Sequence, residues 1–114
     1  MIIGLIFKRM APEVVANKTG NVPYDTKADV WSLGITLLEL AETNPPLHEV
    51  HPMKALMMIP MRDPPAFTHP EKWSRDFKDF VAQCLIKQPE KRKTAVEMQQ
   101  VICDPRFQIL ISFF

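Results

Sequence analysis

The stretch "DVWSLGITLLELAE", residues 29–42, decides the fold of this chain. Apolar side chains stand at positions 30, 31, 33, 35, 37, 38 and 40, so a helix drawn through the stretch has no polar face. Such a helix is buried on all sides in a folded protein. Thr26 followed three residues later by Asp29 has the form of a capping box. The sequence therefore predicts a buried central helix over residues 27–42.

Gly34 lies in the middle of this predicted helix, where glycine costs up to about 1 kcal/mol relative to alanine. The benefit that we expect in return is a close approach by another backbone or by a large side chain. After the helix, the Pro45-Pro46 pair prevents its continuation.

Three shorter helices are predicted between the proline-rich loops. The first covers residues 53–59, with Pro52 at its first position and Pro60 ending it. The second begins after the N-cap Ser74 and ends at Gln88-Pro89. Its apolar residues fall at i, i+3, i+4, i+7 and i+8, which is one stripe facing a core: Phe77, Phe80, Val81, Cys84 and Leu85.

The last predicted helix opens with a second capping box, formed by Thr94 and Glu97. Its apolar residues are Ala95, Met98, Val101 and Ile102. No stretch before residue 105 has the pattern of a strand, so the predicted fold class is all-α.

Composition limits the function classes that the chain can belong to. Its 114 residues form at most one ordinary domain, and 46% apolar with 24% charged residues is typical of a globular protein. A net charge of +1 without a basic cluster argues against nucleic acid as a partner. The N-terminal apolar run is too short to span a membrane or to serve as a signal peptide. Two widely spaced cysteines suit a reducing compartment, so we expect a cytoplasmic protein.

Residues with catalytic or metal-binding chemistry are few. The three histidines, His48, His51 and His69, lie in proline-rich loops without the partners that a catalytic or metal-binding histidine needs. Glu39 and Glu42 lie at the end of the central helix, where we expect solvent exposure. The sequence thus predicts no catalytic, cofactor-binding or metal-binding residue. A methionine-rich stretch can serve either as ordinary packing or as a docking surface; it contains Met53, Met57, Met58 and Met61.

Three motifs in order give the chain a specific resemblance. "MAPEVV" at 10–15, "YDTKADVWSLGITLLELA" at 24–41 and "PEKRKTAVEM" at 89–98 resemble the C-terminal lobe of a eukaryotic protein kinase. The details are most similar to the sterile-twenty-like serine/threonine kinases, in the branch of the lymphocyte-oriented kinase and its Ste-like relatives. The resemblance implies a partial C-lobe over residues 10–103, preceded by a divergent lead-in at 1–9 and followed by an apolar tail at 104–114.

The resemblance also implies roles for individual residues. Ala-Pro-Glu, here Ala11, Pro12 and Glu13, ends the activation segment in the family, and Asp29, Trp31 and Gly34 open its central helix. Glu13 and Arg92 match a buried ion pair of the family; unrelated surface charges are the alternative. In the family the aspartate that matches Asp29 accepts hydrogen bonds from the catalytic-loop backbone; a simple capping role is the alternative.

Phosphoryl transfer in this family needs parts that the 114 residues do not contain. These are a Gly-rich loop, a strand lysine, a catalytic-loop aspartate and a magnesium-binding aspartate. ATP and magnesium are therefore expected for the complete family domain and no cofactor for this chain, which we expect to be inactive alone. The expected partners are protein substrates or a partner kinase. The apolar tail and the uncovered core surface predict self-association or aggregation.

Overall fold

The computed structural model describes residues 8–16, 26–44 and 46–103, and every regular element within those ranges is helical. The all-α prediction is confirmed for these residues. The elements are α2 (Pro12–Ala16), α3 (Lys27–Glu42), α4 (Pro52–Met58), α5 (Arg75–Cys84) and α6 (Ala95–Cys103), with single 3₁₀ turns η1 (Pro70–Lys72) and η2 (Pro89–Lys91). The predicted tail and most of the lead-in lie outside the described residues.

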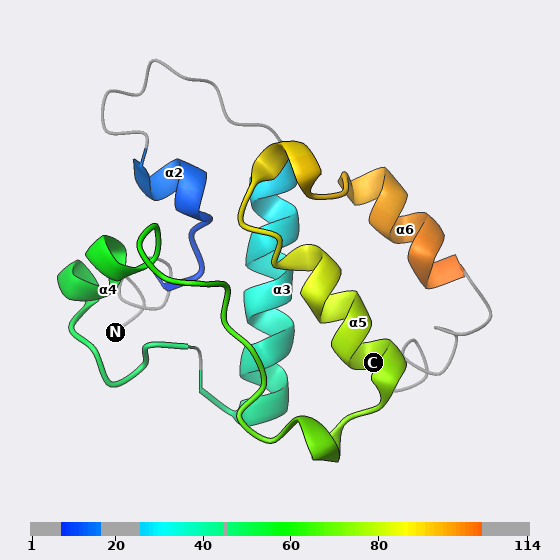
Figure 1. Cartoon of the computed structure of the whole chain (residues 1–114), viewed down its shortest axis with the longest axis horizontal. Helices are drawn as coiled ribbons and strands as arrows, with labels where there is room; N and C mark the ends of the chain where they lie inside the picture. The colour runs from blue at the N-terminus through cyan, green and yellow to red at the C-terminus, as the bar shows by residue number, and fades with distance from the viewer. Residues whose placement is uncertain (1–7, 17–25, 45, 104–114) are drawn as a thin grey trace.

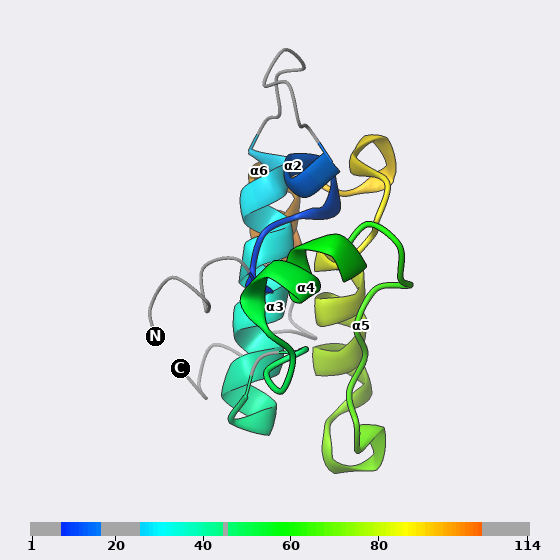
Figure 2. The same cartoon turned by 90° about the vertical axis from the view of Figure 1, so that its left-hand side faces the viewer.

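Helix α3 is the axis around which the other helices are arranged. Figure 1 shows α5 and α6 on one side of α3, and α2 and α4 on the other. In Figure 2 the helices α2, α4 and α5 all lie toward one flank of α3. In the part of the chain that is described, no helix combines the length and apolar character that crossing a bilayer requires.

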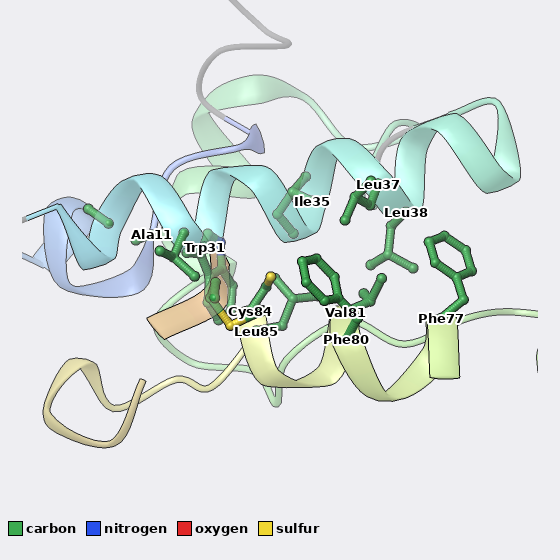
Figure 3. Packing of buried hydrophobic residues seen from close by; sticks show 13 residues of the cluster. Ala11, Trp31, Ile35, Leu37, Leu38, Phe77, Phe80, Val81, Cys84 and Leu85 are labelled. Atoms are coloured by element: carbon green, nitrogen blue, oxygen red, sulfur yellow. The ribbon is translucent and has the colours of Figure 1, made fainter. Parts of the chain in front are cut away.

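The core is formed mainly by the contact between α3 and α5. Figure 3 shows Ile35 and Leu38 of α3 facing Phe80 and Val81 of α5. The predicted stripe on α5 is confirmed, since all five of its residues are buried. Trp31 of α3 and Met98 of α6 complete this cluster.

Gly34 allows α3 and α5 to come into close contact. A Cβ atom at this position would lie 2.8 Å from Cys84 Cβ and 2.8 Å from Leu85 Cδ2. Separations below 3.0 Å do not occur between real Cβ atoms and their neighbours. The close approach expected from the sequence is therefore present, and it is the reason that α3 has a glycine at its centre.

The prediction that α3 is buried on all sides is wrong. Leu33 is 41% exposed and Leu40 is 64% exposed, and Asp29 is exposed as well. These positions are separated by four and seven residues, so they lie on one face of the helix. The described helices cover the rest of α3 and leave this face open. We call Asp29, Leu33 and Leu40 the open face of α3.

Two of the three predicted N-terminal caps are confirmed. Ser74 Oγ accepts a hydrogen bond of 3.1 Å from the Phe77 amide at the start of α5. At the start of α6, the Glu97 amide donates to Thr94 Oγ1 at 3.2 Å, and the Thr94 amide donates to Glu97 Oε1 at 3.2 Å. This is the reciprocal geometry of a capping box.

The third predicted cap, at Thr26, is wrong. Thr26 has helical backbone angles and its side chain makes no capping hydrogen bond. The first turn closes instead through the Thr26 carbonyl, which accepts from the amides of Asp29 at 3.0 Å and Val30 at 3.3 Å. A threonine already in the helical conformation cannot turn its hydroxyl toward the free amides of the first turn. The Asp29 side chain is thus left for another role.

Candidate functional site

The strongest polar site in the described chain is a buried pair between Arg92 and Glu13. Arg92 Nη1 donates to Glu13 Oε2 at 2.7 Å, and Nη2 donates to Glu13 Oε1 at 3.1 Å. The Arg92 side chain is 0% exposed and that of Glu13 is 18% exposed. A bidentate arginine–carboxylate ion pair fixes the relative orientation of the two side chains in addition to pairing their charges.

Arg92 uses its remaining donors on backbone carbonyls of two other segments. Nε donates to the Ile86 carbonyl at 2.7 Å, Nη1 to that of Lys27 at 2.8 Å, and Nη2 to that of Lys87 at 3.2 Å. All five N–H donors of the guanidinium therefore have partners. Three segments, namely α2, the start of α3 and the residues after α5, are joined by this one side chain.

Trp31 closes the site on one side. The guanidinium carbon of Arg92 lies 5.2 Å from the centre of a Trp31 ring, a distance at which a cation and an aromatic face attract each other. Trp31 is only 3% exposed, so the interaction takes place away from water, where it is stronger. We call Glu13, Trp31 and Arg92 the Arg92 centre.

Helix α2 holds Glu13 in position. Pro12 is its first residue, which suits a helical turn that needs no amide donor there. The Ala11 carbonyl accepts from the amides of Val14 at 3.1 Å and Val15 at 3.2 Å. Ala11 and Pro12 are both buried. The Ala-Pro-Glu motif therefore anchors a short helix whose first turn presents a carboxylate to Arg92.

The contact at Gly34 lies near the same centre. Cys84 is a free, buried cysteine, and burial raises the pKa of its thiol to about 12, with Arg92 acting in the opposite direction. A thiol with so high a pKa is not a nucleophile near neutral pH. Cys84 is a packing residue of the α3–α5 contact.

Asp29 is separate from the Arg92 centre. It lies on the open face of α3, and its carboxylate has no hydrogen-bond partner among the residues that the structure describes. The structure thus brings Ala11, Pro12, Glu13, Trp31 and Arg92 together. It places Gly34 against α5 and Asp29 toward solvent.

The expectation that Glu39 and Glu42 face solvent is wrong. Glu39 is 18% exposed and forms an ion pair with Arg9, whose Nε donates to Oε2 at 2.9 Å. Glu42 is half-buried and accepts hydrogen bonds from the amide and the hydroxyl of Thr68. Both partners are distant along the chain, so no local pattern in the sequence could reveal these contacts.

The lead-in residues are attached to the same helix. Ser32 Oγ donates to the Arg9 carbonyl at 2.8 Å, and Lys8 Nζ donates to the His48 carbonyl at 3.0 Å. Residues 8 and 9, where the sequence departs from the family, are therefore bound to α3 and to the loop that follows it.

The histidines have ordinary structural surroundings. His51 is the N-cap of α4, and its Nδ1 accepts from the Met53 amide at 3.2 Å. His48 and His69 are exposed and lie 3.7 Å and 3.4 Å from the carboxylates of Glu49 and Glu71. Across residues 8–16, 26–44 and 46–103, no three His, Cys, Asp or Glu side chains are grouped as metal ligands would be.

Known proteins with similar sequences cover most of this chain. It is 61% identical to the serine/threonine-protein kinase dst2 of Dictyostelium discoideum over 89 residues, which are 78% of this chain and 8% of that protein. It is 55% identical to the serine/threonine-protein kinase cst-1 of Caenorhabditis elegans, and 53% identical to the serine/threonine-protein kinase hippo of Drosophila melanogaster, over the same share of the chain. It spans 17% and 13% of those two proteins.

The family comparison agrees with these relatives. Residues 7–104 match the family described as "Protein kinase domain", and that range contains the Ala-Pro-Glu motif, the central helix and Arg92. The relatives are sterile-twenty-like serine/threonine kinases, as the sequence predicts; the finer assignment to the lymphocyte-oriented branch stays a prediction. The chain belongs to the protein kinase domain family and corresponds to part of its C-terminal lobe.

Proposed function

We propose that this chain is the C-lobe part of a serine/threonine kinase domain, which supports phosphorylation of protein serine or threonine only together with the rest of that domain. Alone, the 114 residues are inactive. The observation that carries this proposal is the open face of α3, where two large apolar side chains and a carboxylate with no hydrogen-bond partner among the described residues are exposed.

The open face has the chemistry of a surface that another segment covers. Burying a leucine side chain contributes about 1.5–3 kcal/mol, so Leu33 and Leu40 favour a protein segment over water. Asp29 lies on the same face, and in the family the matching aspartate accepts hydrogen bonds from the backbone of the catalytic loop. A segment that supplied both apolar contacts and free amides would satisfy all three residues.

The Arg92 centre supports the same proposal. It holds α2, and thus the end of the activation segment, against the start of α3 and the residues after α5 through five hydrogen bonds. In the family the peptide-binding loop directly precedes the Ala-Pro-Glu motif, so rigid attachment of α2 positions that loop. These residues position other parts of the kinase and do not touch the reacting atoms.

ATP and magnesium belong to the complete domain in this proposal. Kinases hold the phosphates with a Gly-rich loop and a strand lysine, and hold magnesium with an aspartate and an asparagine. The sequence has no Gly-rich motif, and no three His, Cys, Asp or Glu side chains are grouped among the described residues. We therefore assign no step of phosphoryl transfer to the residues of this chain.

A chimera tests the proposal. Residues 10–103 would replace the corresponding segment of the hippo kinase, which is 53% identical over the matched region. We expect the chimera to phosphorylate a protein substrate of hippo, whereas the 114-residue chain alone transfers no phosphate from ATP. An inactive chimera that folds and binds ATP, or activity of the chain alone, would contradict the proposal.

Asp29 provides a sharper version of this experiment. Asp29→Asn is expected to leave the stability of the isolated chain nearly unchanged, because the carboxylate is exposed and makes no hydrogen bond to the residues that the structure describes. In the chimera the same change is expected to lower activity by at least tenfold, because the catalytic-loop amides lose a charged acceptor. Glu90→Gln, also at an exposed position, is the matched control and leaves both quantities unchanged.

A second candidate function is an interaction module that binds a kinase substrate or a partner kinase. The exposed methionines of α4 and of the turn after it favour it: Met53 of α4 is 60% exposed and Met57 75%, and Met61 of the turn is 83% exposed. The spacing of four residues places Met53 and Met57 on one face of α4, and methionine adapts to different partners. If this function holds, the chain lowers phosphorylation of a substrate by the complete hippo kinase. Met53→Gln with Met57→Gln removes the effect, whereas Val96→Gln, at an exposed residue of α6, does not.

A further inference from the structure

A groove of about 740 Å³ opens beside the C-terminal half of α3. Its sides are the loop after α3, the end of α4 and the loop of residues 62–73. Apolar side chains line much of it, among them Ile35, Leu38, Ile59 and both tryptophans of the chain, Trp31 and Trp73. Its volume lies in the range of sites that bind small molecules or a few side chains of a peptide.

The charges at the groove are mainly positive. Arg62 and Lys72 line it and are exposed, and their side chains have no hydrogen bond or ion pair within the described ranges. Lys8 is a third lining cation. Two carboxylates, Glu42 and Asp63, also line the groove. Glu42 already accepts two hydrogen bonds from Thr68, so Asp63 is the carboxylate that can oppose an anionic ligand. An anionic ligand can therefore pair with Arg62 and Lys72, whose side chains have no partner among the described residues.

The walls of the groove are fixed before any ligand arrives. Trp73 packs edge-on against Phe77 of the core, with ring centres 5.6 Å apart, and lies 6.1 Å from Phe67. The bonds between Thr68 and Glu42 hold the 62–73 loop against the end of α3. A site with fixed walls loses little conformational freedom on binding, which favours affinity.

We propose that this groove binds an acidic peptide segment of a partner protein. An apolar side chain of the peptide enters between the tryptophans, and carboxylates on either side of it pair with Arg62 and Lys72. Nucleic acid is disfavoured because the net charge of the chain is only +1. The proposal goes beyond the kinase function, because binding at the groove needs neither ATP nor the open face of α3.

Fluorescence anisotropy tests the proposal with three labelled peptides of defined sequence. The acidic probe is Glu-Asp-Leu-Phe-Asp-Glu, the basic probe is Lys-Lys-Leu-Phe-Lys-Lys, and the third replaces Leu-Phe of the acidic probe by Ser-Ser. We expect the 114-residue chain to bind the acidic probe at least about tenfold more tightly than either other probe. Binding weakens as NaCl rises, because salt screens exposed charges, and it changes the intrinsic tryptophan fluorescence.

Charge-reversed variants place the binding at this groove. Arg62→Glu with Lys72→Glu is expected to weaken binding of the acidic probe by about tenfold or more. Lys54→Glu with Lys91→Glu changes the net charge equally at exposed positions outside the groove, and it leaves binding within about twofold. Circular dichroism shows that both variants keep their helix content. Equal binding of all three probes, equal loss in both variants, or no binding to the folded chain would overturn the proposal. A chimera that is active as a kinase while the acidic probe does not bind would refute the groove proposal alone.

Discussion

Arg92 and Glu13 are separated by 79 residues in the sequence, and their side chains form a two-bonded ion pair in which the arginine is completely buried. The remaining donors of Arg92 bind three backbone carbonyls. Removing either member of the pair leaves a charge or several carbonyls without partners in a dry site. We therefore expect the loss of either side chain to destabilise the protein, because the remaining one would be buried without its partner.

Arg92→Ala is expected to lower the free energy of unfolding by about 3–5 kcal/mol, because it leaves the Glu13 carboxylate without its charged partner in a largely buried position. Urea unfolding followed by circular dichroism measures the change. In a double-mutant cycle, adding Glu13→Gln to Arg92→Ala costs less than Glu13→Gln does alone. The control Arg75→Ala, at an exposed arginine, changes stability by no more than about 0.5 kcal/mol. Additive effects of the two changes would show that the pair does not act as a unit.

Gly34→Ala is expected to destabilise the chain by about 1–3 kcal/mol, as overpacking does in a close-packed core. The new Cβ atom would meet Cys84 and Leu85 at 2.8 Å. Helix propensity alone predicts the opposite effect, an increase in stability of up to about 1 kcal/mol, because alanine favours a helix more than glycine does. The direction of the change in melting temperature therefore decides between close helix contact and simple propensity.

Leu33→Gln combined with Leu40→Gln is expected to reduce self-association of the isolated chain. Both residues lie on the open face of α3, so the change removes exposed apolar surface without opening the core. Sedimentation velocity measures the fraction of oligomer, which should fall while the melting temperature stays nearly constant. Leu37→Gln, at a buried position of the same helix, is the contrasting variant and lowers the melting temperature sharply. If the double variant associates as strongly as the parent chain, the open face is not the surface that associates.

The stability of the chain is expected to fall as pH rises from about 9 toward 12. The folded-state pKa of Cys84 is raised by burial from 9.0 to about 12, so the folded state holds the thiol proton more tightly than the unfolded state. The stability that comes from keeping the buried thiol protonated is fully present below pH 9, and it is lost as the pH approaches the pKa of Cys84 in the folded state. Melting temperatures at pH 8 and pH 10.5 should differ less for Cys84→Ala than for the parent, both in a Cys103→Ser background. If the melting temperature changed equally between the two pH values in the parent and in Cys84→Ala, the Cys84 thiol would not be buried in its neutral form.

Thr94→Ala is expected to raise the pKa of Glu97 toward its ordinary value. The Thr94 amide and hydroxyl both donate to Oε1 of Glu97 and lower the pKa of that carboxyl. The resulting stabilisation is present above the ordinary pKa of a glutamate and is lost as pH falls through the lowered value. Titration by NMR of the side-chain carboxyl carbons measures the shift, with Glu90 as an internal reference.

The sequence predicts the helices well where the pattern is local. The stripe on α5 follows from spacing alone, because an amphipathic helix has a single apolar face to bury. The same reasoning fails for α3, since a helix that is apolar all round gives no sign of which face its neighbours leave open. The caps at Ser74 and Thr94 are local features and were predictable. The absence of a cap at Thr26 depends on its backbone conformation, which residue types do not determine.

The candidate site also contains some contacts that the sequence predicts and others that it does not. The partnership of Glu13 with Arg92 is available from the sequence only through resemblance to the kinase family, because nothing in the intervening residues connects the two positions. The pairing of Arg9 with Glu39 was missed, since the lead-in departs from the family at that point. The groove was missed because its walls come from four separate segments. Cavities between segments are set by tertiary packing, and no periodic pattern records them.

The two side chains of the ion pair in the Arg92 centre are synthesised at different times, because Glu13 precedes Arg92 by 79 residues. A ribosome that adds about 5–20 residues per second makes Arg92 about 4–16 s after Glu13, given their 79-residue separation. During that interval α2 has a carboxylate without its partner, and the Lys27 carbonyl at the start of α3 lacks one of its donors. The nascent chain thus completes this junction only after α2, α3, α4 and α5 have been made. A defect at Arg92 would accordingly appear first as a low yield of folded protein, because the unfinished chain is exposed to proteases and to association for longer.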